Sequence, residues 1–110
     1  MYLDKVVLCA SSAYEQKYYL NEDFNTLPDS IKEELKIMCV LYTEEVGGIL
    51  TLEFDEEGNL MLNVTSDEGD ILYDEIGSVL KIKELQQKKS ELLESLELFY
   101  KVFLLGEDLA

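Results

Sequence analysis

The alternation of apolar and polar residues is clearest in residues 48–65, GILTLEFDEEGNLMLNVT. A period of two is typical of strands with one buried and one wet face. Between the two alternating runs, residues 55–59 predict a type I turn closed by Gly58 with a positive φ, so the stretch predicts an antiparallel hairpin. The side chains expected to be covered are Leu50, Leu52, Phe54, Leu60, Leu62 and Val64.

Two more strands are predicted before the first helix. Residues 5–10, KVVLCA, are mostly β-branched and apolar, and residues 11–13 predict a break. Residues 14–20, YEQKYYL, fit a strand, but Tyr14 and Tyr18 also have the i,i+4 spacing of a helix face. We favour a strand paired with the first, because tyrosines suit a half-buried pleated surface.

A helix is predicted over residues 28–46. Pro28 suits the first helical position, and Gly47 and Gly48 end the helix. We expect this helix to cover the dry face of the sheet and to meet another surface on its far side, because its second half is apolar nearly all round. The first face holds Ile31, Leu35, Met38, Tyr42 and Val46, and the additional apolar residues are Ile37, Cys39, Val40 and Leu41.

A long C-terminal helix is predicted over residues 70–105, with Asp70 as its cap. Residues 86–91 contain no apolar side chain, so the helix either bends at 86–90 or extends unbroken to a partner. Together the elements predict a single α+β domain over residues 1–110. Its order is ββαββα, and its antiparallel sheet is covered on one face by the helix 28–46 and the C-terminal helix.

The end of this helix is unusually apolar, since ten of the fourteen residues 92–105 are apolar. Such a stripe either completes the core of the monomer or marks a surface for association. We favour association, as a homodimer or with another protein. Residues 81–89 hold four lysines and one glutamate, a basic stretch that fits the acidic turn of a second subunit. The candidate partner-binding residues are Leu92, Leu96, Phe99, Tyr100 and Phe103.

Charge narrows the choice of partners. The chain has 24 acidic and 9 basic residues, a net charge of −15, and every basic residue is lysine. This field repels phosphate backbones and anionic lipids, so neither a nucleic acid nor a membrane is expected as a partner. The chain also lacks histidine, and with it the side chain that titrates near neutrality and the imidazole ligand for metals.

The remaining candidates for chemistry are cysteines and carboxylates. Cys9 and Cys39 lie in apolar runs, which is typical of packing thiols in a reducing compartment, and with a short apolar N-terminal run this predicts a cytoplasmic protein. A calcium loop around Gly58 fails because Val64 stands at the place of the bidentate glutamate. We therefore expect no catalytic residue, no metal and no cofactor. Glu44–Glu45 and Glu53 have the chemistry of a general acid–base pair, but surface glutamates at a helix end are the commoner interpretation of this pattern.

Three sequence strings carry a resemblance: TEEVGG at 43–48, YEQKYYLN at 14–21 and MCVL at 38–41. The chain resembles an uncharacterised bacterial family of short acidic proteins over nearly its whole length. In size and charge it is also similar to dimeric secretion chaperones. Neither resemblance implies a mechanism.

These observations leave three hypotheses for function. The first is a non-enzymatic protein-interaction module that forms a homodimer through the C-terminal helix. The second is an acidic inhibitor, antitoxin-like or chaperone-like protein that neutralises a basic partner, with an affinity that falls steeply with salt. The third is a small enzyme or metal site built from carboxylates and tyrosine.

Overall fold

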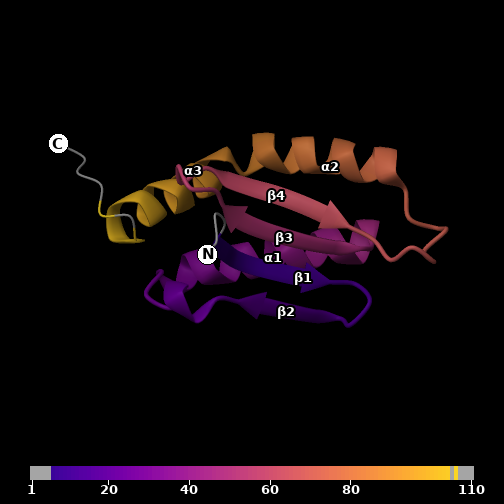
Figure 1. Cartoon of the computed structure of the whole chain (residues 1–110), viewed down its shortest axis with the longest axis horizontal. Helices are drawn as coiled ribbons and strands as arrows, with labels where there is room; N and C mark the ends of the chain where they lie inside the picture. The colour runs from indigo at the N-terminus through magenta and orange to yellow at the C-terminus, as the bar shows by residue number, and fades with distance from the viewer. Residues whose placement is uncertain (1–5, 105, 107–110) are drawn as a thin grey trace.

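The structure is a computed structural model that describes residues 6–104 and Gly106, and it forms a mixed α+β domain (Figure 1). A four-stranded sheet carries three helices on one side. In chain order the elements are β1 (Val6–Ser12), β2 (Lys17–Leu20), the 3₁₀ turn η1 (Glu22–Phe24), α1 (Asp29–Val46), β3 (Ile49–Phe54), β4 (Leu60–Thr65), α2 (Glu75–Lys88), α3 (Ser90–Phe99) and the π-helical turn η2 (Tyr100–Leu104).

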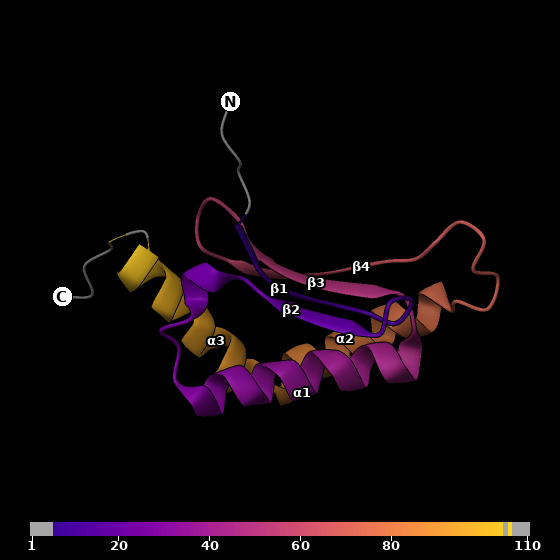
Figure 2. The same ribbon diagram turned by 90° about the horizontal axis from the view of Figure 1, so that it is seen from below.

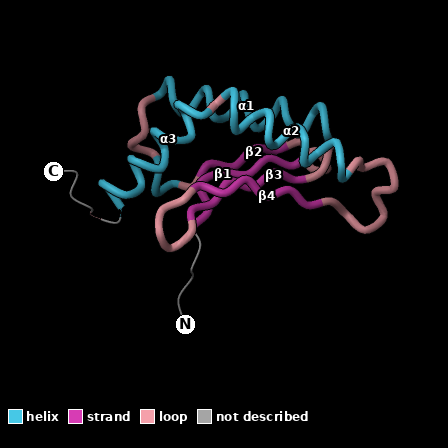
Figure 3. Tube along the Cα trace, turned by 90° about the horizontal axis from the view of Figure 1, so that it is seen from above, coloured by secondary structure: helices cyan, strands magenta, loops and turns pink. Residues whose placement is uncertain are grey.

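The sheet has the strand order β2-β1-β3-β4, and all neighbours are antiparallel. Figures 2 and 3 show α1, α2 and α3 on the same side of the sheet, with the opposite sheet face free of any described element. The predicted α+β class and the helices on one face are confirmed.

The central hairpin has the predicted register. β3 pairs with β4 so that Leu50, Leu52 and Phe54 face Val64, Leu62 and Leu60, and the β3 members are fully buried. The β4 members are partly buried and pack against the same core, because β4 lies at the edge of the sheet. The dry face predicted from the period of two is therefore the floor of the core.

The hairpin turn is held by the carboxylate of Asp55. Its Oδ1 accepts hydrogen bonds from the backbone N–H groups of Glu57 at 3.0 Å and Asn59 at 2.9 Å, and Gly58 has the expected positive φ of 89°. These bonds favour the ionised carboxylate and lower the pKa of Asp55, with the bond from the Asn59 N–H as the largest cause. The acidic turn is therefore a structural cap.

Replacement of this cap tests the turn. We expect Asp55→Ala to lower the midpoint of urea unfolding at pH 7, because it removes the acceptor for two backbone donors. A depressed pKa contributes stability that is present above the unfolded value of 3.8 and is lost as pH falls through the lower folded value, so the difference between the two proteins should shrink as pH falls below 3.8. A gap of equal size at pH 7 and pH 2.5 would contradict this origin.

The first two strands differ in extent from the prediction. β1 continues through Ser11 and Ser12, which were predicted to break it, while Lys5 lies outside the described residues. Residues 14–20 contain a strand, as favoured, but it begins only at Lys17, and the preceding residues form a turn. Ser11 stays in the strand because its hydroxyl is buried and hydrogen-bonded to α1.

Helix α1 ends as predicted at Gly47, whose φ of 87° suits glycine. Pro28 is the residue before the helix instead of its first residue. The inward face of α1 packs on the sheet, but Ile37 and Leu41 on the far side are 50% and 58% exposed. The expectation that this far side meets another surface is therefore not met within the described chain.

The predicted C-terminal helix 70–105 is divided into two helices, so the alternative of a bend at 86–90 holds and the unbroken helix does not. α2 begins at Glu75 with Asp74, and not Asp70, as its cap, because the Asp74 Oδ1 accepts the Gly77 N–H at 3.0 Å. The helix breaks at Lys89, inside the predicted 86–90 region, and α3 continues from Ser90. In the described part of the chain, no helix is both long and apolar enough to cross a bilayer.

Candidate functional site

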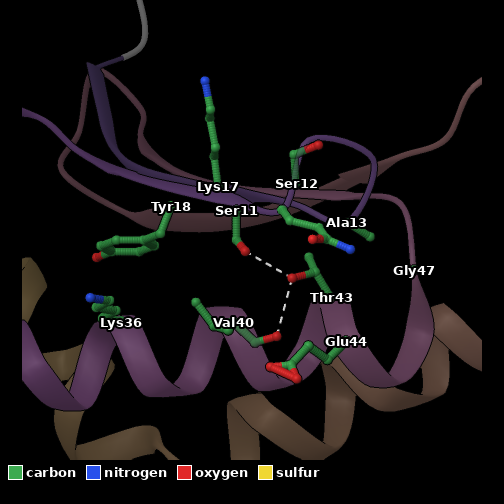
Figure 4. Close-up of a pocket in the computed structure, with 11 residues that line it drawn as sticks. Ser11, Ser12, Ala13, Lys17, Tyr18, Lys36, Val40, Thr43, Glu44 and Gly47 are labelled. Atoms are coloured by element: carbon green, nitrogen blue, oxygen red, sulfur yellow. Dashed lines mark hydrogen bonds between the residues drawn. The ribbon is translucent and has the colours of Figure 1, made fainter.

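A cleft of about 910 Å³ lies between the β1–β2 hairpin and α1 (Figure 4). In the figure Ser11 and Thr43 point toward each other across it, while Lys17 points away from Thr43. The lining mixes apolar, polar and charged side chains: Ser11, Ser12, Ala13, Gln16, Lys17, Tyr18, Lys36, Val40, Thr43, Glu44 and Gly47.

The two hydroxyls in this cleft form hydrogen bonds between β1 and α1. Thr43 Oγ1 donates to the carbonyls of Cys39 and Val40, each at 3.2 Å, and lies 2.8 Å from Ser11 Oγ. Because the Thr43 proton goes to the helix backbone, Ser11 donates to Thr43. Activation of a hydroxyl nucleophile needs an adjacent base, and the sequence has no histidine to provide one. The Ser11–Thr43 hydrogen bond therefore stabilises the packing of β1 on α1.

A buried group of thiols and phenol lies next to this cleft. Cys9 Sγ and Cys39 Sγ are 3.8 Å apart, and both residues are fully buried. The pKa of Cys39 is raised, first by its hydrogen bond with Cys9 and then by burial. The pKa of Tyr18 is raised mainly by burial of its hydroxyl, which has no hydrogen-bond partner among the described residues. The raised pKa values keep the Cys39 thiol and the Tyr18 phenol protonated at neutral pH, and both cysteines pack in the core.

The carboxylates considered for acid–base chemistry or metal binding are engaged separately. Glu53 accepts a hydrogen bond from Asn63 across the β3–β4 pair on the open sheet face. Glu45 pairs with Lys81 at 3.1 Å on the helical side. Within residues 6–104 and Gly106, no three histidine, cysteine or acidic side chains converge as ligands for a metal. The geometry brings together no candidate acid–base pair from Glu44, Glu45 and Glu53.

The five candidate partner-binding residues do not form one exposed stripe. Leu92, Leu96 and Tyr100 lie in the core of the monomer, and Phe99 packs against it. Phe103 is 70% exposed. The alternative that this segment completes the monomer core therefore holds for most of it.

An aromatic cluster explains this burial. The rings of Phe54 and Tyr100 stack at 4.2 Å with an interplanar angle of 3°, and Phe24 stacks on both at 5.7 and 6.3 Å. Offset aromatic contacts of this kind add about 0.5–1.5 kcal/mol per pair beyond the buried area. They join η1, β3 and the start of η2, and so hold the C-terminal apolar residues against the sheet.

A groove of about 610 Å³ separates α1 from α2. Its apolar lining includes Ile37, Met38, Leu41 and Leu85. Ion pairs cross its rim, with Lys81–Glu45 at 3.1 Å and Lys89–Glu34 at 3.2 Å, and Lys88–Glu84 at 2.6 Å lies along α2. The hydrogen bond to Glu45 raises the pKa of Lys81, and the one from Lys88 lowers the pKa of Glu84. The rim is charged and the floor is apolar.

Two groups of exposed aliphatic side chains lie on the helices and on the loop before α2. The first, here called the groove patch, is Ile37, Leu41 and Leu80, the last 61% exposed. The second, here called the connector patch, comprises Ile71, Leu72, Ile76 and Val79, on α2 and the loop before it. The sequence analysis singled out Ile37 and Leu41 on the far side of the helix 28–46, but it did not predict the exposure of Leu80 or the connector patch. The available signal was a second apolar face on residues 76–85, opposite the buried Ser78 and Ile82.

The fold and these surfaces define a small acidic α+β domain whose helical side carries unpartnered apolar patches. A family model matches residues 5–108, and the chain belongs to this family of unknown function, DUF6145. Comparison with curated proteins and with solved structures gives no match.

A pair of leucines two residues apart tests the assignment of α3 to the core. We expect Leu96→Ala to lower the free energy of unfolding by about 2–5 kcal/mol, because Leu96 is buried and leaves a cavity. Leu98→Ala is the matched control, since Leu98 is 48% exposed, and its cost should stay within about 1 kcal/mol. Urea unfolding measures both, and equal losses would contradict the assignment.

Proposed function

We propose that the protein is a non-enzymatic interaction module that forms a homodimer through the groove patch on α1 and α2. The observation that carries this proposal is the exposure of Ile37 and Leu41 in the apolar groove, and of Leu80 on the neighbouring helix α2, on an otherwise acidic protein. Contiguous exposed aliphatic side chains rimmed by charge mark association surfaces. Leu80 lies in the first part of the predicted C-terminal helix, and Ile37 and Leu41 lie on α1.

Charge along α2 favours a second copy in antiparallel orientation. The helix has acidic residues Asp74 and Glu75 at its start and Lys83 and Lys88 in its second half. Lys83 forms no ion pair within the described chain. A two-fold axis near Leu80 runs the two copies of α2 in opposite directions. Lys83, about 4.5 Å along the helix from Leu80, then lies near the acidic start of the second copy's α2, which is about 7.5 Å from Leu80. Self-association then pairs opposite charges around an apolar centre.

The engagement of the hydroxyls in the cleft between the β1–β2 hairpin and α1 supports the non-enzymatic part of the proposal. The hydroxyls of Ser11 and Thr43 are used between the sheet and α1, and the Cys9 and Cys39 thiols are buried. Binding without chemistry is therefore the simplest role for these surfaces. An interaction module is also consistent with the separate engagement of the surface carboxylates.

Sedimentation velocity over a concentration series tests the dimer. We expect Leu80→Glu to raise the dimer dissociation constant at least about tenfold, because it places an unpaired carboxylate at the apolar centre. Leu98→Glu is the matched control and should leave the dimer intact, because Leu98 lies on α3 outside the patch. A wild-type chain that sediments as a monomer up to 100 µM would overturn the proposal.

A further inference from the structure

The loop between β4 and α2 projects beyond the end of the sheet (Figure 2). It carries Ile71 and Leu72, which are 91% and 90% exposed. Ile76 and Val79 continue this apolar surface onto the first turns of α2. The connector patch thus presents four aliphatic side chains to solvent at one end of the molecule.

The loop is anchored on both sides of these side chains. On one side, the Tyr14 hydroxyl donates to Asp70 Oδ2 at 2.6 Å and accepts the Asp67 N–H at 3.0 Å. On the other, Tyr73 packs against Gly48, where an added Cβ would lie 2.7 Å from the Tyr73 ring. Asp70 Oδ1 also accepts the Leu72 N–H at 3.3 Å. The exposed pair is therefore held in place, which lowers the ordering cost of binding.

The surroundings of the patch are acidic. Residues 67–75 contribute five carboxylates, and the sequence has no basic residue between Lys36 and Lys81. None of these five carboxylates forms an ion pair with another described residue. The patch therefore combines apolar contact area with uncompensated negative charge. The five are Asp67, Glu68, Asp70, Asp74 and Glu75.

We propose that the connector patch binds a cationic amphipathic helix of a partner protein, with the partner's apolar face on Ile71, Leu72, Ile76 and Val79 and its lysines or arginines against residues 67–75. Helix binding to an apolar surface depends on aliphatic anchors, and opposite charge around them selects the partner. The carboxylates repel an anionic lipid surface and a second acidic loop alike. This inference rests on the proposed interaction module and specifies its partner. Its aliphatic anchors lie outside the groove patch, but the antiparallel dimer would also use Asp74 and Glu75, so the partner's helix competes with the second copy at the start of α2.

A synthetic 18-residue leucine–lysine peptide that forms an amphipathic helix serves as the probe, and a scrambled peptide of equal composition is its control. We expect the amphipathic peptide to bind at least tenfold more tightly than the scrambled one by fluorescence anisotropy. Its amide shift perturbations in NMR spectra should cluster in residues 67–80. Added salt should weaken binding, since charge contributes to it.

The double variant Ile71→Ser/Leu72→Ser should weaken binding of the amphipathic peptide at least about tenfold, because both anchors are lost. Leu98→Ser, at an exposed leucine of α3 outside both patches, is the control and should bind like the wild type. Equal binding of the two peptides, perturbations spread over the whole chain, or wild-type affinity in the first variant would overturn the inference. Circular dichroism checks that both variants are folded. Sedimentation of the first variant separates the proposals, since it should still dimerise even if peptide binding fails.

Discussion

The covering of one sheet face is the constraint on which the rest of this structure depends. Leu50, Leu52 and Phe54 on β3 are completely buried, so the helices must cover them. A four-stranded sheet about 15–20 Å wide needs two helices side by side, which pack about 10 Å apart. α1 provides the first, and α2 with α3 provide the second. The stack of Tyr100 on Phe54 fixes the end of α3 over the sheet, and the break at Lys89 lets α3 take a different direction from α2.

The two outer surfaces of the domain differ in character as a result. The open sheet face is mixed, and its polar side chains satisfy one another locally, as Glu53 and Asn63 do across β3 and β4. The outer helical side has ion pairs at the rim of the α1–α2 groove and aliphatic side chains between and beyond them. An open sheet face of this kind is stable in water. The uncovered aliphatic side chains are on the helices and the connector.

Local sequence signals predicted the hairpin, the end of α1 and the place where the C-terminal helix breaks. Each depends on residues close in the chain. These signals are the period of two, Gly47, and the stretch around Ser90 that has no apolar residue. The identity of the exposed apolar residues was not predictable in this way, because residues 76–85 and 92–103 both carry apolar side chains on more than one helix face. Which face is buried is decided by contacts distant in sequence, such as the Tyr100–Phe54 stack. The Tyr14–Asp70 anchor spans 56 residues and has no local signal.

The two thiols also give the domain an internal reporter. Cys9 lies on β1 and Cys39 on α1, their sulfur atoms are 3.8 Å apart, and neither has any exposed surface. A thiol reagent in solution reaches them only when the sheet and the helix separate, since these are the two cysteines of the chain. The rate at which the native protein consumes such a reagent therefore measures how often its two layers open, without any introduced label.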